Sequence, residues 1–286
     1  MKIKKIGVIG AGQMGTGIAQ TAIQFGYQVC LRDANEELTR KSSAKIEKGL
    51  ARLVEKGKLT EDQKKGQMAL LQSCPDLHCV AQSDIVIEAI TENPKLKMEL
   101  FRELDKLAPK ETILASNTSS ISITLLGSAT SRPEQVVGIH FFNPVPVMKL
   151  VEIVRSLRTS DATFQAAMGL AESMGKTPVP VKDSPAFVVN RILLPMINEA
   201  IYVLQEGIAD AKAIDTAMKL GCNLPMGPLE LADFVGLDTT LAVLEVLYQD
   251  MGNDKYHPAP LLHKYVEAGW LGRKSGRGFF DYSAQK

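Results

Sequence analysis

The segment "KIGVIGAGQMGTGIAQTAIQFGYQVCLRD", residues 5–33, decides the fold. Residues 5–12 form a short apolar run that ends in glycines, which is typical of a buried strand. Residues 15–26 have helical spacing and end at a glycine that can cap a helix, and residues 27–33 have the composition of a second strand. A strand, a helix and a strand within about thirty residues have the size of one βαβ unit.

The glycines of "GAGQMG" lie where a dinucleotide needs them. Gly10 permits the tight turn, Gly12 lets a pyrophosphate approach the backbone, and Gly15 lets the helix pack closely on the strand. Asp33 ends the second strand, where a carboxylate accepts a hydrogen bond from a ribose 2′-OH and repels a 2′-phosphate. This pattern predicts NAD rather than NADP, although Arg32 could receive a 2′-phosphate. The expected cofactor residues of this segment are Gly10, Gly12, Gln13, Met14, Gly15 and Asp33.

The alternation of elements continues beyond this unit. Further strands are expected at residues 84–90, 112–117, 136–142 and 149–154, with a helix at residues 95–108. Strands alternating with helices favour a mostly parallel sheet that is covered on both faces.

From about residue 183 onward, the sequence shows no convincing strand. Residues 183–207 begin with Asp-Ser before Pro185, which predicts a capped helix start, and residues 210–221 and 227–248 also have helical patterns. We therefore expect a Rossmann-like α/β domain over residues 1–183, with a helical insertion at about 40–72, and an all-α domain over residues 184–286.

Composition excludes several classes of partner. The 286 residues carry a formal net charge of +1, so nucleic acid is not an expected partner. Residues 6–31 and 112–131 are uncharged but rich in Gly and Gln, or in Ser and Thr, so we expect neither to span a membrane. The N-terminus has no cleavable signal pattern, and we expect a cytoplasmic protein.

The four cysteines are Cys30, Cys74, Cys79 and Cys222. Their scattered positions predict no disulfide framework and fit a reducing compartment. Cys74, His78 and Cys79 lie close in sequence, but their spacing is not that of a usual zinc site, so no metal is expected.

The stretch "VVGIHFFNPVPVMKLVEIV", residues 136–154, places His140 and Glu152 on successive predicted strands. A histidine can take a hydroxyl proton as a hydride leaves, and a buried carboxylate can fix its tautomer. A core histidine beside a solvent-facing glutamate is the alternative. The polar cluster at residues 115–120 and Asn143 both follow predicted strands, where open α/β sheets bind ligands or where polar residues simply form turns.

Motifs along nearly the whole chain resemble those of the 3-hydroxyacyl-CoA dehydrogenase family. They are "GVIGAGQMGTGIAQ", "EAITENPKLKMELF", "ASNTSS", "HFFNPVPVMKLVEIV", "KDSPAFVVNRIL", "DTAMKLGCNLPMGPLELADFVGLD" and "GRKSGRGFFDY". The resemblance implies reversible NAD(H)-dependent hydride transfer between (S)-3-hydroxybutanoyl-CoA and acetoacetyl-CoA, in short-chain fatty acid (butanoate) metabolism. It also implies a homodimer or a higher homo-oligomer.

The resemblance also assigns roles to residues. His140 is the implied base, Glu152 its partner, and Ser119 and Asn190 the implied substrate contacts, in a cleft between the two domains. Besides the glycine loop and Asp33, the implied cofactor contacts are Glu92, Lys97, Asn117 and Asn143.

Residues 45–59 form an amphipathic stretch with a basic stripe. The stripe consists of Lys45, Lys48, Arg52 and Lys56. Such a stripe is usually a solvated helix face, but the family places coenzyme A contacts in this insertion, so Lys56 and Arg52 are expected to bind its phosphates. Some members have a serine near Gly49, which this chain lacks.

Two other functions remain as alternatives. A 3-hydroxyacid dehydrogenase of the 6-phosphogluconate type uses a lysine as its acid and base, where this chain has "NRIL" at residues 190–193. A non-enzymatic dinucleotide-binding protein would keep the glycine loop and lose the catalytic set.

Overall fold

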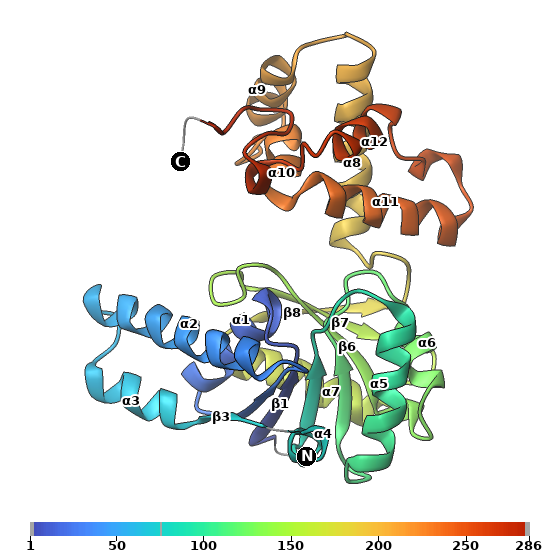
Figure 1. Cartoon of the computed structure of the whole chain (residues 1–286). Coiled ribbons are helices and arrows are strands. Elements are labelled where there is room, and N and C mark those ends of the chain that lie inside the picture. Colours follow the sequence, from blue (N-terminus) through green and yellow to red (C-terminus); the bar gives the residue numbers. More distant parts are fainter. Residues whose placement is uncertain (1–2, 75, 284–286) are drawn as a thin grey trace. The chain divides into compact units, whose positions relative to one another are not determined.

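The computed structural model of the chain describes residues 3–74 and 76–283. It divides into two compact units, with the boundary between Ser184 and Pro185 (Figure 1). The strands are β1 (Lys5–Ile9), β2 (Gln28–Arg32), β3 (Leu71–Ser73), β4 (Ile85–Glu88), β5 (Ile113–Ser116), β6 (Val136–Phe141), β7 (Leu150–Arg155) and β8 (Thr177–Lys182).

The α-helices of the first unit are α1 (Gln13–Gln24), α2 (Glu36–Glu55), α3 (Glu61–Ala69), α4 (Leu77–Ala81), α5 (Pro94–Leu107), α6 (Ile123–Ser128) and α7 (Asp161–Ser173). Those of the second unit are α8 (Val189–Gln205), α9 (Ala211–Gly221), α10 (Pro228–Val235), α11 (Leu237–Met251) and α12 (Pro260–Glu267). Short 3₁₀ turns lie at Pro133–Gln135, Asp254–Tyr256 and Arg273–Ser275.

The eight strands form one sheet in the order β3-β2-β1-β4-β5-β6-β7-β8. Strands β1 to β6 pair in parallel, β7 runs antiparallel to β6, and β8 is parallel to β7. The first six strands have the order of a Rossmann fold, whose ligand crevice lies where the strand order reverses, between β1 and β4. The predicted α/β domain with a mostly parallel sheet is confirmed.

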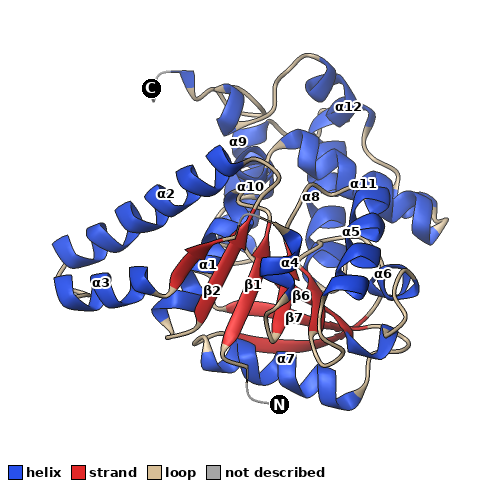
Figure 2. Cartoon of the chain, turned by 60° about the horizontal axis from the view of Figure 1, so that its bottom comes forward, coloured by secondary structure: helices blue, strands red, loops and turns tan. Residues whose placement is uncertain are grey.

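Helices cover both faces of this sheet (Figure 2). On one face, α1, α2 and α7 share a hydrophobic core with side chains such as Val8 and Ile139. On the other face, α4 and α6 approach closely, because a Cβ at Gly7 would meet Val80 and a Cβ at Gly138 would meet Ile123. Alternate residues of β6 therefore face opposite layers.

The sequence analysis missed β3, β8 and α7. Strand β3 has only three residues. Strand β8 contains Pro178 and Pro180, which argue against a strand except at a sheet edge, and β8 pairs only with β7. Helix α7 begins after Ser160, whose side chain accepts a hydrogen bond from the backbone N–H of Thr163.

The helical insertion is a pair of antiparallel helices, α2 and α3, that lie side by side (Figure 1). Asn35 caps α2 by accepting a hydrogen bond from the N–H of Glu37, and Thr60 with Gln63 forms a capping box at the start of α3. The insertion thus begins a few residues earlier than expected.

The first helix of the second unit starts later than the sequence suggested. Ala186 and Phe187 have φ angles of 58° and 55°, so the chain turns there, and α8 begins at Val189 without a side-chain cap. The expected capped start at Asp-Ser-Pro was therefore wrong. The pattern at residues 227–248 is two helices, because Gly236 breaks it with a φ of 104°.

Two buried aspartates hold the helical unit together. Asp215 accepts hydrogen bonds from the N–H groups of Leu229 and Glu230 at 2.9 Å, and Asp233 accepts them from the N–H groups of Phe279 and Phe280 at 2.9 Å. The predicted all-α unit is confirmed. In it, Asp215 holds the start of α10, and Asp233 holds the segment after α12. Among the residues that the structure describes, no helix is long and apolar enough to cross a membrane.

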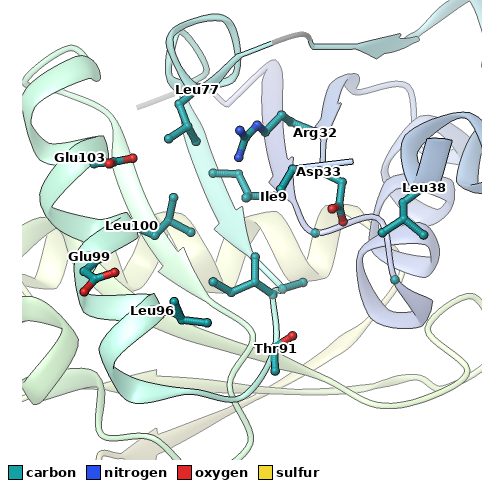
Figure 3. Close-up of a pocket in the computed structure, with 15 residues that line it drawn as sticks. Ile9, Arg32, Asp33, Leu38, Leu77, Thr91, Leu96, Glu99, Leu100 and Glu103 are labelled. Atoms are coloured by element: carbon teal, nitrogen blue, oxygen red, sulfur yellow. The ribbon is translucent and has the colours of Figure 1, made fainter. Parts of the chain in front are cut away.

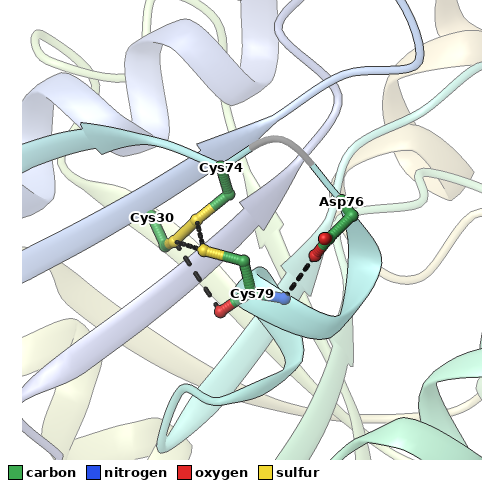
Figure 4. Close-up of a disulfide and its surroundings, with 4 residues drawn as sticks. All are labelled: Cys30, Cys74, Asp76 and Cys79. Carbon is green, nitrogen blue, oxygen red and sulfur yellow. Dashed lines mark hydrogen bonds between the residues drawn. A yellow bond between two sulfur atoms is a disulfide. The ribbon is translucent and has the colours of Figure 1, made fainter.

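The expectation that no disulfide forms was wrong. Cys30 and Cys74 are joined, although 44 positions separate them in sequence (Figure 4). The pairing of β2 with β3 brings the two residues together, which sequence spacing does not reveal. The third sulfur beside them belongs to Cys79, so the cluster contains Cys30 where the sequence motif suggested His78.

Candidate active site

Most predicted cofactor residues of the first unit gather at one edge of the sheet, in segments that follow the carboxyl ends of β1, β2, β4, β5 and β6. Because these five strands are parallel, their carboxyl ends meet along the same edge, as expected for an open α/β sheet. His140 lies within β6 and Glu152 within β7, whereas Arg52 and Lys56 lie on α2 and its C-terminal cap.

The glycine loop after β1 has the shape of a phosphate cradle. Gly10 has a φ of 103°, and a side chain there would press into the Ala89 carbonyl. A side chain at Gly15 would overlap the Gly10 carbonyl, so α1 packs tightly on the loop. Gly12 caps α1 and faces open space, which leaves room for a pyrophosphate beside the first helical N–H groups. These residues fit a dinucleotide.

Asp33 lies against this loop. Its Oδ2 accepts a hydrogen bond of 2.7 Å from the N–H of Ala11. Asp33 and its neighbour Arg32 both line a pocket of about 540 Å³ together with Gly10 and Gly12 (Figure 3). The Nε atom of Arg32 is buried and has no hydrogen-bond partner in the described part of the chain. The pocket therefore presents both the carboxylate that was predicted to favour NAD and a cation beside it.

The opposite wall of this pocket comes from residues that the sequence analysis did not assign to the site. Leu96 and Leu100 of α5 and Leu77 of α4 supply apolar side chains (Figure 3). An apolar slot next to a carboxylate suits the flat adenine ring of a dinucleotide. The helical spacing of Leu96 and Leu100 indicated an amphipathic helix, but sequence alone could not show which cavity it would line.

A buried carboxylate, Glu88, ends β4 and was missed. It is 0% exposed and accepts hydrogen bonds from Lys97 Nζ at 2.5 Å, from the N–H of Ile90 at 2.7 Å and from Ser116 Oγ at 2.6 Å. Burial raises the pKa of Glu88, against the opposing charge and hydrogen bond of Lys97. The signal in the sequence was an acid inside the apolar run "DIVIEAI".

Lys97 links Glu88 to Glu92. Its ammonium lies 3.1 Å from Glu92 Oε2 and 3.3 Å from the Ile90 carbonyl oxygen, and the residue is only 1% exposed. Burial acts to raise the pKa of Glu92, but the charge of Lys97 and the hydrogen bond from Thr118 hold it below the ordinary value. These are therefore not loose surface charges, as the sequence alone would suggest.

Glu92 holds the loop after β5. Its Oε1 accepts hydrogen bonds from Thr118 Oγ1, from the N–H of Ser119 at 3.0 Å and from Ser120 Oγ at 3.2 Å. Ser119 is half-buried, and its own hydroxyl lies 3.5 Å from the same oxygen. Glu92 and Ser119, assigned separately from the sequence, are thus parts of one network.

Two asparagines connect the remaining loops. Asn117 Oδ1 accepts a hydrogen bond of 2.9 Å from the N–H of Phe141, which ties the end of β5 to the end of β6. Asn143 Oδ1 accepts one of 2.9 Å from Gln13 Nε2, which ties the segment after β6 to the start of α1. Asn143 therefore connects the glycine loop side to the histidine side of the site, and Asn117 connects the loop after β5 to the same strand end.

His140 and Glu152 are direct partners. They stand opposite each other in the antiparallel pairing of β6 and β7, and Nδ1 of His140 lies 2.7 Å from Oε2 of Glu152. Both are buried, with exposed fractions of 6% and 1%. The expected contact is confirmed, and the alternative of a solvent-facing glutamate is wrong.

Asn190 belongs to the second unit. It lies in the first turn of α8 and is half-buried there. Arg191 follows it, so no lysine occupies this part of the helix.

The basic stripe lies on α2 and its C-terminal cap. Lys45, Lys48, Arg52 and Lys56 are all exposed, and none of the four has an ion pair within residues 3–74 and 76–283. Ile46 and Leu50 are buried on the opposite side of the helix. Lys45 also lines a small pocket with Gln13 and Asn143, so the stripe begins beside the glycine loop.

Family models match both units. Residues 5–184 match the NAD binding domain of 3-hydroxyacyl-CoA dehydrogenase, and residues 187–282 match its C-terminal domain. Together these matches cover nearly all of the described chain.

Related proteins and a solved structure point to the same family. The chain is 56% identical to a probable 3-hydroxybutyryl-CoA dehydrogenase of Bacillus subtilis, over 99% of this chain and 98% of that protein. It is 52% identical to the 3-hydroxybutyryl-CoA dehydrogenase of Bradyrhizobium diazoefficiens, over 99% of this chain and 97% of the relative. A crystal structure of (S)-3-hydroxybutyryl-CoA dehydrogenase from Ralstonia eutropha superposes with a TM-score of 0.95 at 50% identity, covering 98% of this chain and 99% of that one.

Proposed function

Because this chain belongs to the 3-hydroxyacyl-CoA dehydrogenase family of NAD-dependent oxidoreductases, we propose that it interconverts (S)-3-hydroxybutanoyl-CoA and acetoacetyl-CoA. The observation that carries the proposal is the buried contact between His140 and Glu152 at the edge of the sheet that also holds the dinucleotide loop. The four-carbon substrate comes from the names of the relatives. A role in short-chain fatty acid metabolism follows from that substrate.

We assign the proton transfer to His140. Glu152 faces Nδ1, so Nε2 is the ring nitrogen directed at the substrate oxygen. In the oxidation, Nε2 takes the hydroxyl proton, and Glu152 stabilises the imidazolium that forms. In the reduction, the imidazolium returns the proton to the forming alkoxide. NAD(H), when bound, supplies the hydride acceptor or donor.

Ser119 and Asn190 are the proposed groups that orient the substrate oxygens. Hydrogen-bond donors aimed at a developing charge contribute about 3 kcal/mol each to the lowering of a barrier. Ser119 suits the role because Glu92 fixes its backbone. Lys97 in turn fixes Glu92, so we propose that Lys97 acts on the cofactor site through Glu92.

The coenzyme A moiety has a proposed place on α2. Its phosphates carry several negative charges, and Lys48, Arg52 and Lys56 present exposed cations without protein partners in the described part of the chain. The stripe starts at Lys45, next to Gln13 and Asn143, which gives the thioester a path from the helix toward the glycine loop.

We also propose that the protein works in the cytoplasm as a homo-oligomer. The helical unit exposes large apolar side chains, among them Ile192 and Leu220, which a second copy would remove from water. Light scattering after size exclusion would show a mass of at least twice the monomer's 31.1 kDa. A monomer at micromolar concentration would contradict this assembly.

The activity is tested by NADH oxidation with two substrates. Acetoacetyl-CoA should be reduced rapidly, whereas free acetoacetate should be reduced slowly, because it lacks the coenzyme A that α2 is proposed to bind. Binding of NADH without turnover of acetoacetyl-CoA would indicate a protein that only binds the dinucleotide. Faster turnover of the free acid would favour a 3-hydroxyacid dehydrogenase.

A further inference from the structure

Three cysteine sulfurs lie together in the first unit (Figure 4). Cys30 lies in the middle of β2, Cys74 directly follows β3, and Cys79 lies in α4. Cys30 and Cys74 form a disulfide, and their Cα atoms are 5.8 Å apart, a usual separation for such a bond. Cys79 Sγ lies 2.8 Å from Cys74 Sγ and 3.6 Å from Cys30 Sγ. A free thiol therefore stands within reach of an existing disulfide.

The backbone holds these sulfurs together independently of any bond between them. Cys30 is fixed by the pairing of β2 with β1 and β3. The N–H of Cys74 donates a hydrogen bond of 2.9 Å to the Leu31 carbonyl, and Asp76 accepts one of 2.7 Å from the N–H of Cys79. These contacts hold the three cysteines near one another without relying on the bond between Cys30 and Cys74.

Solvent reaches the three sulfurs unequally. Cys30 is 0% exposed and Cys74 is 5% exposed, whereas Cys79 is half-buried. A thiol from solution must therefore enter the cluster through Cys79, because attack on sulfur requires access to it.

We propose that Cys30, Cys74 and Cys79 form a thiol–disulfide exchange site that takes low-molecular-weight thiols and disulfides. In the first step, the Cys79 thiolate attacks Cys74 Sγ. The bond between Cys74 and Cys79 forms, the bond between Cys74 and Cys30 breaks, and Cys30 leaves as a thiolate that takes up the proton Cys79 lost. This step moves the disulfide to the accessible side without net oxidation or reduction.

The next two steps reduce the site. The thiolate of an external thiol attacks Cys79 Sγ, forms a mixed disulfide with it and releases Cys74 as a thiolate. A second external thiol attacks the external sulfur of that mixed disulfide and releases Cys79. The protein disulfide gains two electrons, and the two external thiols become one external disulfide. The reverse sequence oxidises the site.

The site adjoins the dinucleotide pocket through two residues. Leu77, between Cys74 and Cys79, lines that pocket, and so does Arg32, two positions after Cys30. Exchange replaces a link between β2 and the segment after β3 by a link between that segment and α4.

Peptide mapping of the full-length protein tests the proposal. The protein is incubated with mixtures of reduced and oxidised glutathione, quenched with acid, and alkylated with N-ethylmaleimide. We expect disulfides between Cys30 and Cys74 and between Cys74 and Cys79, together with glutathione attached to Cys79. The absence of both the Cys74–Cys79 disulfide and the Cys79 adduct at every glutathione ratio would overturn the proposal.

Reduction kinetics give a second measurement. Cys79→Ser should slow the reduction of the disulfide by glutathione about tenfold or more, because the neighbouring thiol is lost as the entry point. Cys222→Ser is the matched control, since Cys222 is an exposed free cysteine of the second unit, and it should leave the rate unchanged. Equal rates for Cys79→Ser, folded as judged by NADH binding, and the unmodified protein would refute the exchange. Mapping of the unmodified protein decides the question if the variant does not fold.

Discussion

Nδ1 of His140 and Oε2 of Glu152 lie 2.7 Å apart, across the antiparallel pairing of β6 and β7. Both residues are buried, so the carboxylate has little water to solvate it and interacts strongly with the ring. In the proposed mechanism, the pair acts as a single unit of acid–base chemistry.

His140→Gln and Glu152→Gln should each lower kcat with acetoacetyl-CoA. We expect a loss of about 10²- to 10⁴-fold, the usual contribution of a positioned acid or base. NADH binding, followed by its fluorescence, should change little, because neither residue lines the dinucleotide pocket. Near-normal turnover of a folded His140→Gln protein would show that the proton goes elsewhere.

Glu88→Gln should lower kcat/KM, although Glu88 is not itself proposed to contact the substrate. Glu88 joins Lys97 and Ser116, and through Lys97 it fixes Glu92 and the loop of Ser119. Misplacement of that loop should lower kcat/KM by about 100-fold.

Two comparisons make the Glu88 experiment specific. Glu111→Gln, at an exposed residue before β5, should leave kcat/KM unchanged. Glu88→Asp retains the charge and should recover part of the loss. If Glu88→Gln lowered only thermal stability and left the kinetic constants intact, Glu88 would be a purely structural residue.

Asp33 should control the choice of cofactor. The unmodified enzyme is expected to have a higher kcat/KM with NADH than with NADPH. Asp33→Ser removes the repulsion of a 2′-phosphate next to Arg32, so the ratio of the two constants should fall by about 100-fold. The kcat at saturating NADH serves as the internal control and should hold. An unmodified enzyme that works equally well with NADPH would contradict the assignment.

The basic stripe should affect KM for coenzyme A thioesters alone. The double variant Lys48→Glu and Arg52→Glu should raise KM for acetoacetyl-CoA about tenfold at low salt and less at high salt, because salt screens exposed charges. KM for the N-acetylcysteamine thioester, which lacks phosphates, should not change. Lys65→Glu on α3 is the matched exposed control. A rise in both KM values would point to distortion of α2.

Acid should destabilise the first unit through Asp105. Its carboxylate accepts hydrogen bonds of 2.7 Å from Arg132 Nε and from the N–H of Ser131. Burial acts to raise the pKa of Asp105, but the hydrogen bonds from Ser131 and Arg132 hold it below the ordinary value. The folded protein therefore binds this proton more weakly than the unfolded chain does.

Because the pKa of Asp105 is lower in the folded protein than in the unfolded chain, this carboxylate stabilises the fold at neutral pH and loses that effect in acid. The stabilisation is complete above the unfolded pKa of about 4 and disappears as pH falls through the lower folded value. Asp105→Asn should lower the free energy of unfolding by about 3 kcal/mol at neutral pH, because it leaves Arg132 without its carboxylate. Urea unfolding between neutral and acid pH should show that the difference shrinks as pH falls. A difference that stays constant down to pH ~3 would exclude Asp105 as the titrating group.

Local patterns in the sequence were enough to predict the dinucleotide loop and the main strands, whereas the pairing of His140 with Glu152 was one of two interpretations and was chosen through the family resemblance. The glycine spacing restricts what the turn after β1 can be, and the apolar runs around His140 and Glu152 place both on strands. What sequence could not supply was contact between distant segments. The importance of Glu88 becomes visible only through its hydrogen bonds with Lys97 and Ser116, which are distant in sequence. Cys30 contacts Cys74 because β2 pairs with β3.

Strand β8 and the start of α8 were misjudged because their local signals were misleading. Strand β8 has prolines that a sheet tolerates only at an edge, and edge position is a property of the whole fold. The start of α8 was predicted too early because Ala186 and Phe187 adopt positive φ angles, which residue type alone does not foretell.

Because β7 runs antiparallel to β6, the contact between His140 and Glu152 depends on the register of the two strands. Along a strand, odd and even positions point to opposite faces, and here Ile139 stands opposite Ile153 as His140 stands opposite Glu152. A slip of one position would leave both backbones paired but turn the carboxylate toward the α1 and α7 layer. The turn at residues 142–149 must therefore keep the pairing of His140 with Glu152 in register, while its Asn143 and buried Val145 hold it against the start of α1.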